Sequence, residues 1–209
     1  MLRGAFKPRA QEPAQALLTA AAYGDMPALQ KEIQKNKNRI DAADGAGKNA
    51  LLYALENGFE EHAALLLHHG ARHDVSAATG ETPLMFACAK MLSGATEKLL
   101  LQGADMNARD YMDDTALMKA ARAGHGWAAC RLVAAGADMD AQNKKGETAE
   151  SLARENLEPR DFVCFMNAVQ ARHQAAAAAA QEKIAAQGVL QRDIVPLKVI
   201  QLRPRPPRQ

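Results

Sequence analysis

The chain has 209 residues, which leaves room for one ordinary domain with tails. Hydrophobic residues make up 48% of it but aromatic residues only 4%, so the apolar content is largely alanine and leucine and favours small, closely packed helices. The formal net charge of +2 is close to balanced, and bulk charge therefore gives no argument for a nucleic-acid partner.

The three cysteines Cys88, Cys130 and Cys164 are an odd number without a CxxC pair. This pattern argues against a disulfide framework or a zinc site and favours a reducing compartment. Neither a signal-peptide core nor an apolar run long enough to span a membrane is present in the sequence. We therefore expect a cytoplasmic protein without membrane contact.

The N-terminal part divides into a loose segment and a helical pair. Residues 1–13 are polar and contain prolines, so we expect a flexible segment. Residues 14–43 have helical periodicity, with Leu29 and Ile33 on one face of the second helix. This pair has polar residues where later pairs are apolar, which is typical of the N-terminal cap of a repeat array.

A pattern with a period of 33 residues follows, in three full repeats at residues 44–76, 77–109 and 110–142. Its most regular members are two series of residues at that spacing: Thr82, Thr115 and Thr148, with Asn49 one period earlier, and Gly70, Gly103 and Gly136, each followed by Ala. A fixed period of this size predicts a stacked array of supersecondary units that share one core.

The repeated segments resemble the ankyrin-repeat family over roughly residues 14–170. The segments that carry the resemblance are Thr82-Pro83-Leu84, Thr115-Ala116-Leu117, Gly124-His125, Leu99-Leu100, Gly103-Ala104 and Asn107. The resemblance implies an all-α solenoid of helix-turn-helix units with short β-hairpin fingers, and binding of a protein partner as its function.

The residue types also have physical reasons. A Thr before a helix accepts hydrogen bonds from free backbone N–H groups, and Pro83 at a first helical position loses no hydrogen bond. Met91 stands where the other repeats have the glycine of the inter-helix turn, so we expect that turn to be distorted. Polar Glu150 at a core position indicates that residues 143–170 form the C-terminal cap repeat.

The C-terminal part is predicted to be one long helix and an extended tail. The helix is expected from near Pro159 to near Ala186, with residues 171–187 as an alanine-rich extension that Gly188 ends. Residues 188–209 are basic and contain prolines. They are either a disordered tail or a docking peptide, and their charge suits an acidic partner.

Motifs that carry chemistry are largely missing: the sequence has no phosphate loop, HExxH or GxSxG. His68, His69 and His73 lie close together in sequence, which keeps a metal-binding protein or an enzyme as an alternative hypothesis. His125 and Cys88 are interpreted as structural residues. We expect no cofactor and no catalytic residue.

The remaining hypothesis is recognition by finger tips and inner helices. The candidate protein-binding residues are Tyr111, Met112, Tyr53, Phe86, Lys119, Arg122, Lys144 and Lys145. Exposed aromatic, Met and Arg residues are enriched at protein interfaces, although Tyr53 and Phe86 alternatively pack between repeats. The favoured function is a non-enzymatic scaffold or adaptor; a bacterial effector that enters a host cell without a cleavable signal peptide is the alternative.

Overall fold

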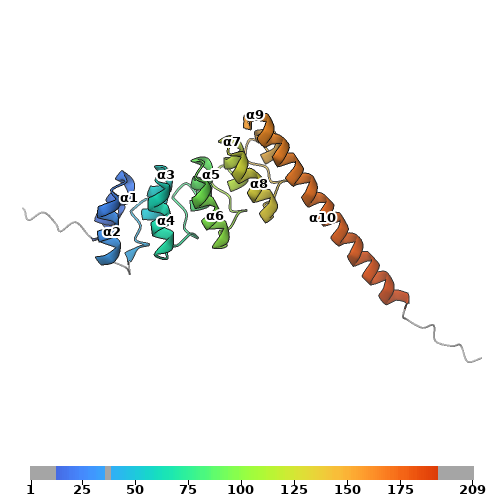
Figure 1. The fold of residues 1–209 in the computed structure, drawn as a ribbon, viewed down its shortest axis with the longest axis horizontal. Helices are drawn as coiled ribbons and strands as arrows, with labels where there is room; N and C mark the ends of the chain where they lie inside the picture. Colours follow the sequence, from blue (N-terminus) through green and yellow to red (C-terminus); the bar gives the residue numbers. More distant parts are fainter. Residues whose placement is uncertain (1–12, 36–38, 193–209) are drawn as a thin grey trace, which may run out of the picture. The chain divides into compact units, whose positions relative to one another are not determined.

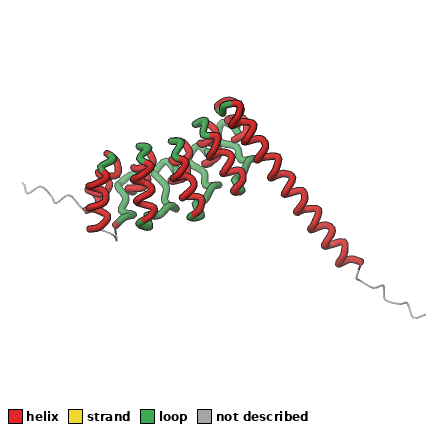
Figure 2. Tube along the Cα trace, in the orientation of Figure 1, coloured by secondary structure: helices red, strands yellow, loops and turns green. Residues whose placement is uncertain are grey.

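The computed structural model describes residues 13–35 and 39–192. This part of the chain contains ten α-helices connected by turns and loops, and no strand (Figure 2). The chain divides into two compact units, residues 1–169 and residues 170–209. The predicted flexible segment 1–13 lies outside the described residues except for its last residue, and so does most of the predicted tail.

Five helix pairs follow one another along the described part of the chain, and the last pair ends with the longest helix (Figure 1). The helices are α1 (Pro13–Tyr23), α2 (Met26–Lys35), α3 (Ala50–Glu56), α4 (Glu60–His68), α5 (Pro83–Ala89), α6 (Ser93–Leu101), α7 (Ala116–Arg122), α8 (Gly126–Ala135), α9 (Ala149–Asn156) and α10 (Pro159–Arg192). The inner helices α1, α3, α5, α7 and α9 contact one another in succession, and the outer helices α4, α6 and α8 do the same. The predicted all-α solenoid is therefore confirmed.

The inner helices begin as the repeat pattern predicts. One side-chain oxygen at each N-cap accepts a hydrogen bond from the amide three residues later, in helices α3, α5, α7 and α9. The four N-caps are Asn49, Thr82, Thr115 and Thr148. Each cap satisfies a backbone donor that the helix itself leaves without a partner, so one polar residue per repeat fixes where the inner helix starts.

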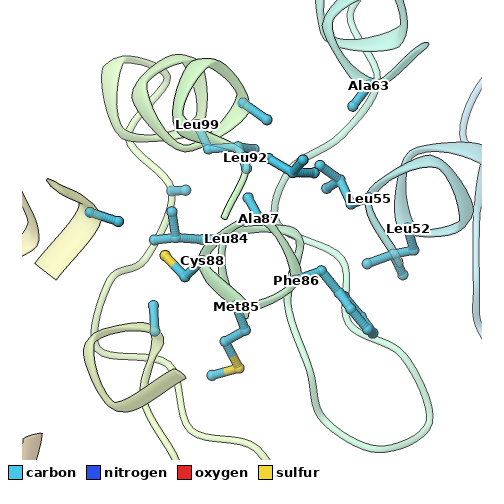
Figure 3. Close-up of a cluster of buried hydrophobic side chains, with 14 of the residues drawn as sticks. Leu52, Leu55, Ala63, Leu84, Met85, Phe86, Ala87, Cys88, Leu92 and Leu99 are labelled. Carbon is cyan, nitrogen blue, oxygen red and sulfur yellow. The ribbon is translucent and has the colours of Figure 1, made fainter. Parts of the chain in front are cut away.

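One continuous core runs through the repeats. Leu66 of α4, Leu99 of α6 and Leu132 of α8 occupy the same position in successive repeats, and all three are 0% exposed within one cluster of buried side chains. Figure 3 shows the middle of this core, where Leu55 of α3 and Leu84 of α5 lie with Leu99. Truncating such a leucine to alanine typically costs about 2–5 kcal/mol of stability.

The inter-helix turn at Met91 was predicted to be distorted, and its geometry shows otherwise. Met91 has a φ of 59°, close to the 79° of Gly58 and the 75° of Gly124 at the same position in neighbouring repeats. The next amide, that of Leu92, donates to the Ala87 carbonyl at 2.9 Å and closes the turn. The expected distortion is therefore wrong, because Met91 accepts the left-handed conformation at a cost of about 1–2 kcal/mol.

The predicted β-hairpin fingers are tight turns rather than hairpins. In the described part of the chain, the only strand-like pairing outside the helices is an isolated bridge between Gln142 and Thr148. The arms of each finger are too short to form the repeated ladder that defines a strand. The fingers are held by other contacts, which are described below.

The last helix agrees with the prediction at its start and differs at its end. α10 begins at Pro159, and Phe165 on its first turns is 1% exposed and belongs to the core of the first unit. The predicted stop at Gly188 is wrong, because α10 continues to Arg192. A single glycine in a helix costs only about 1 kcal/mol, which strong helix formers on its N-terminal side offset.

Candidate functional site

Four turns, one between each helix pair and the next, form the fingers of the array. These fingers are residues 44–48, 77–81, 110–114 and 143–147. In each finger the first amide donates to the carbonyl four residues later, over 2.9–3.1 Å. The fourth residue of each has a positive φ; in the third finger it is Asp113, at 59°, which takes the place of a glycine because Asp tolerates the left-handed conformation.

A side-chain oxygen at the first finger position braces three of the four turns. Oδ1 of Asp110 accepts hydrogen bonds from the amides of Met112 (2.8 Å) and Asp114 (2.9 Å). Asp44 and Asn143 accept the corresponding pairs in their own fingers. Ala77 occupies this position in the second finger and has no side-chain oxygen to offer.

Backbone hydrogen bonds join each finger to the next. The amides of Ala78, Tyr111 and Lys144 donate to carbonyls of the preceding finger, those of Ala46, Thr79 and Met112, over 3.0–3.1 Å. Donors and acceptors both recur at the repeat spacing. The four fingers therefore form one connected surface without any strand, and a residue at a finger tip has a fixed place relative to its neighbours.

Tyr111 and Met112 are the exposed large hydrophobic residues of the described fingers. Tyr111 is 69% exposed and Met112 is 46% exposed. The ring of Tyr111 lies over Gly80 of the preceding finger, where an added Cβ would be 3.2 Å from the ring. Lys144 donates a hydrogen bond from Nζ to the Tyr111 carbonyl, which brings a cation to the same place.

Lys119 lies beneath the tips and joins two fingers. Its ammonium contacts Glu81 of the second finger at 2.9 Å and Asp110 of the third at 2.7 Å, and Asp114 is 3.7 Å away. Burial alone would lower the pKa of Lys119, but its hydrogen bonds to Asp110 and Glu81 outweigh burial and raise it. Lys119 is thus already paired, and its cation stabilises the stack.

Arg122 has the same role one finger further on. Its guanidinium pairs with Asp114 of the third finger and lies 3.0 Å from Glu147 of the fourth. Nδ2 of Asn143 donates to both of these carboxylates at 2.8 Å. Burial would raise the pKa of Asp114, but the hydrogen bonds from Arg122 and Asn143 outweigh burial and lower it.

Tyr53 takes the place of Lys119 in the first repeat. Its hydroxyl donates to Oδ2 of Asp44 at 2.5 Å. This hydrogen bond, with burial, raises the pKa of Tyr53 to about 12. The same hydrogen bond outweighs burial at Asp44 and lowers the pKa of that carboxyl. Nζ of Lys48 lies 5.7 Å from the centre of the Tyr53 ring and 2.8 Å from Glu56. The hydroxyl of half-buried Tyr53 and the neighbouring Lys48 ammonium therefore both have partners within the first repeat.

Phe86 is buried, so the expectation that it faces outward is wrong. It occupies the place of Tyr53 and Lys119 in the second repeat, but it is 8% exposed and belongs to the core (Figure 3). The finger residue at the matching position explains the difference, since Asp44 and Asp110 attract a donor whereas Ala77 does not. Phe86 therefore packs between repeats, the alternative left open by the sequence.

The structure sorts the eight candidates into groups. Tyr111, Met112 and Lys144 come together on adjacent finger tips, and Lys145 is exposed beside them. Lys119 and Arg122 lie below as ion-paired supports, and Tyr53 is two repeats away. Sequence reasoning missed Asp110 as the main partner of Lys119. The recurrence of Asp or Asn at the first finger position was the signal that pointed to it.

The histidines do not form a metal site in the described residues, where no three His, Cys, Asp or Glu side chains gather suitably. His68 and His69 are exposed neighbours with ring centres 5.3 Å apart. His125 is buried, with Nε2 3.0 Å from the Ser93 hydroxyl and Nδ1 3.3 Å from the Cys88 carbonyl. Burial lowers the pKa of His125, and these contacts give it a structural role between repeats.

Comparison with protein families agrees with this geometry. Residues 71–143, which contain the second and third fingers and the first residue of the fourth, match the family model of ankyrin repeats in three copies. Residues 71–143 of this chain are therefore ankyrin repeats. Ankyrin repeats are generally modules for protein–protein interaction, and the family is generally non-enzymatic. A comparison with curated proteins gives no match. None of the described helices is both long and apolar enough to cross a lipid bilayer.

Proposed function

We propose that this ankyrin-repeat protein is a non-enzymatic binding module that holds a protein partner on its finger tips, with Tyr111 and Met112 at the centre. The observation that carries the proposal is their exposure in an otherwise paired surface. The carboxylates and cations beneath them are engaged with one another, whereas the Tyr111 ring and the Met112 side chain face solvent.

The groups around this centre indicate the chemistry of the partner. Lys144 and Lys145 are exposed on the next finger and add positive charge beside the apolar pair. A partner segment with an apolar side chain flanked by Asp or Glu fits this arrangement, because large apolar groups supply affinity and charge at the rim supplies steering. The connected fingers form this surface before binding, so little ordering of the module opposes association.

The test is affinity purification of the partner, followed by measured affinities for variants. The double variant Tyr111→Ala, Met112→Ala is expected to weaken binding roughly 10- to 100-fold, since interface hot spots contribute more than about 1 kcal/mol each. Its melting temperature stays that of the parent, because both side chains are exposed. Leu101→Ala, at a 77% exposed position of the outer helix α6, is the matched control and leaves the affinity unchanged.

Undiminished binding by the double variant, with Leu101→Ala also unchanged, removes the finger tips from the proposed site. A scaffold role and a cytoplasmic location stay predictions. The effector hypothesis depends on the tail, and residues 193–209 of that tail lie outside the described residues. No contact of the described residues favours it, so the binding module is the single function proposed.

A further inference from the structure

Two cysteines from different helices meet at the C-terminal end of the repeat array. Cys130 lies in α8 and Cys164 in the first turns of α10, 34 residues apart in sequence. Their sulfur atoms are 2.8 Å apart, and both residues belong to the first compact unit. Both are free thiols. A disulfide needs sulfurs about 2 Å apart, so only a small movement separates this pair from a bond.

The packing of α10 against α8 holds the two sulfurs together. Phe165, next to Cys164, is 1% exposed and anchors this part of α10 in the core. Gly126 at the start of α8 allows a close approach, because an added Cβ would be 2.3 Å from the Asp161 side chain. The contact between the sulfurs thus follows from buried packing on both sides.

The two thiols differ in environment in a way that suits stepwise oxidation. Cys164 is exposed, and an oxidant in solution reaches it. Cys130 is half-buried, and burial together with the adjacent Cys164 raises its pKa to about 12. Cys164 is therefore the group that reacts first, and Cys130 is the neighbour that resolves the product.

We propose that Cys130 and Cys164 form a reversible intrachain disulfide that links α8 to α10 when the protein meets a hydroperoxide. The Cys164 thiolate attacks one peroxide oxygen, the O–O bond breaks, and Cys164 becomes a sulfenic acid as the leaving oxygen takes up a proton. The Cys130 sulfur then attacks the Cys164 sulfur, its proton goes to the departing hydroxide, and the S–S bond replaces the S–O bond. Two thiols are oxidised and one hydroperoxide is reduced, with one water and one alcohol as products, or two waters when the oxidant is hydrogen peroxide. A dithiol reductant reverses the change by thiol–disulfide exchange.

The disulfide closes a loop that contains the fourth finger and α9. Residues 143–147 and helix α9 (Ala149–Asn156) lie between the two cysteines, and α9 is the last inner helix of the described residues. A cross-link across this loop restricts its unfolded conformations. Oxidation is therefore expected to slow hydrogen exchange of the α9 amides and to raise the melting temperature.

The test treats the full chain with hydrogen peroxide and counts thiols by alkylation under denaturing conditions. The count is expected to fall from three to one, and Cys88, which is buried, accounts for the remaining thiol. After trypsin, peptide 123–131 is expected to be joined to peptide 161–172, and dithiothreitol separates them. Cys164→Ser, at an exposed position, is expected to keep its fold and to lose both the cross-link and the slower exchange of α9.

Three outcomes overturn the proposal. One is a Cys164 that stays a sulfenic or sulfinic acid while Cys130 remains alkylatable. Another is a disulfide between two chains through Cys164, seen as a dimer on a non-reducing gel. The third is a joined peptide that contains Cys88. None of them bears on partner binding at the finger tips, so this test is independent of the proposed function.

Discussion

Replacing Ala77 with asparagine is expected to stabilise the protein by supplying a brace that the second finger lacks. The fingers at 44–48, 110–114 and 143–147 each begin with Asp or Asn, whose side-chain oxygen accepts two amide hydrogen bonds. The backbone bonds of the 77–81 finger match those of the other three, so the same acceptor geometry is available. Asparagine is preferred to aspartate because apolar Phe86 occupies the position from which Tyr53 or Lys119 donates in other repeats.

The size of the effect follows from the two amides, those of Thr79 and Glu81, that would gain an acceptor. A hydrogen bond contributes a net of about 0.5–1.5 kcal/mol, so two give about 1–3 kcal/mol. Ordering the asparagine side chain costs roughly 1 kcal/mol, which leaves a gain of about 1 kcal/mol. For a chain of this length, such a gain raises the melting temperature by about 2–4 °C.

The assay is thermal unfolding of the parent, Ala77→Asn and Ala77→Leu at neutral pH. Leucine has the same number and branching of side-chain heavy atoms as asparagine but no oxygen, so it separates hydrogen bonding from filled space. We expect only the asparagine variant to melt above the parent. If the two variants melt together, or asparagine melts below the parent, the reasoning from equivalent finger positions is refuted.

Two further predictions concern the turns and the ion pairs. Met91→Gly is expected to raise the free energy of unfolding by about 0.5–1 kcal/mol, because glycine adopts the left-handed φ without a Cβ clash. Met91→Ala keeps the Cβ and is expected to give no gain. A urea titration of both variants and the parent measures the difference. Folding lowers the pKa of the Asp114 carboxyl below its ordinary value of about 3.9. The ionised carboxylate therefore stabilises the fold above the ordinary value, and this stabilisation is lost as pH falls through the lower value of the folded state. Arg122→Leu, which removes a main cause of that shift, is expected to flatten melting temperature against pH between about 5 and 3; an unchanged slope contradicts the assignment.

Much of the fold is predictable from the sequence because the repeats carry local signals. The N-cap residues Asn49, Thr82, Thr115 and Thr148 mark where inner helices start, and each acts within three residues of its own position. The core leucines recur at the same spacing and share one interior. Signals of this kind depend on neighbouring residues, so a single sequence is enough to interpret them.

The candidate site was only partly predictable, because its support comes from contacts between repeats. Exposure of Tyr111 and Met112 follows from their place at a finger tip. In contrast, Lys119 meets Glu81 from 38 residues away, and that contact depends on how two units stack. The burial of Phe86 was not predictable for the same reason, since it depends on Ala77 in the second finger and not on helix α5, which carries Phe86.

The structure of the C-terminal part could not be predicted from the repeat pattern. The approach of Cys130 to Cys164 exists because Phe165 is buried in the core and Asp161 of α10 lies close to Gly126 of α8. The spacing of those two cysteines has no motif that predicts it. Similarly, Gly188 was expected to end a helix that in fact continues, since a glycine ends a helix only where the chain turns away from it.

The most direct test of the central claim is site-specific photo-cross-linking in native cells. A photoreactive amino acid is placed at Met112 of the third finger or, in a separate variant, at Leu101 of the outer helix α6, both exposed positions. The account predicts a protein adduct from position 112, of the same partner whose affinity falls for Tyr111→Ala, Met112→Ala, and none from position 101. Adducts of that partner at position 101 and not at 112 would contradict it.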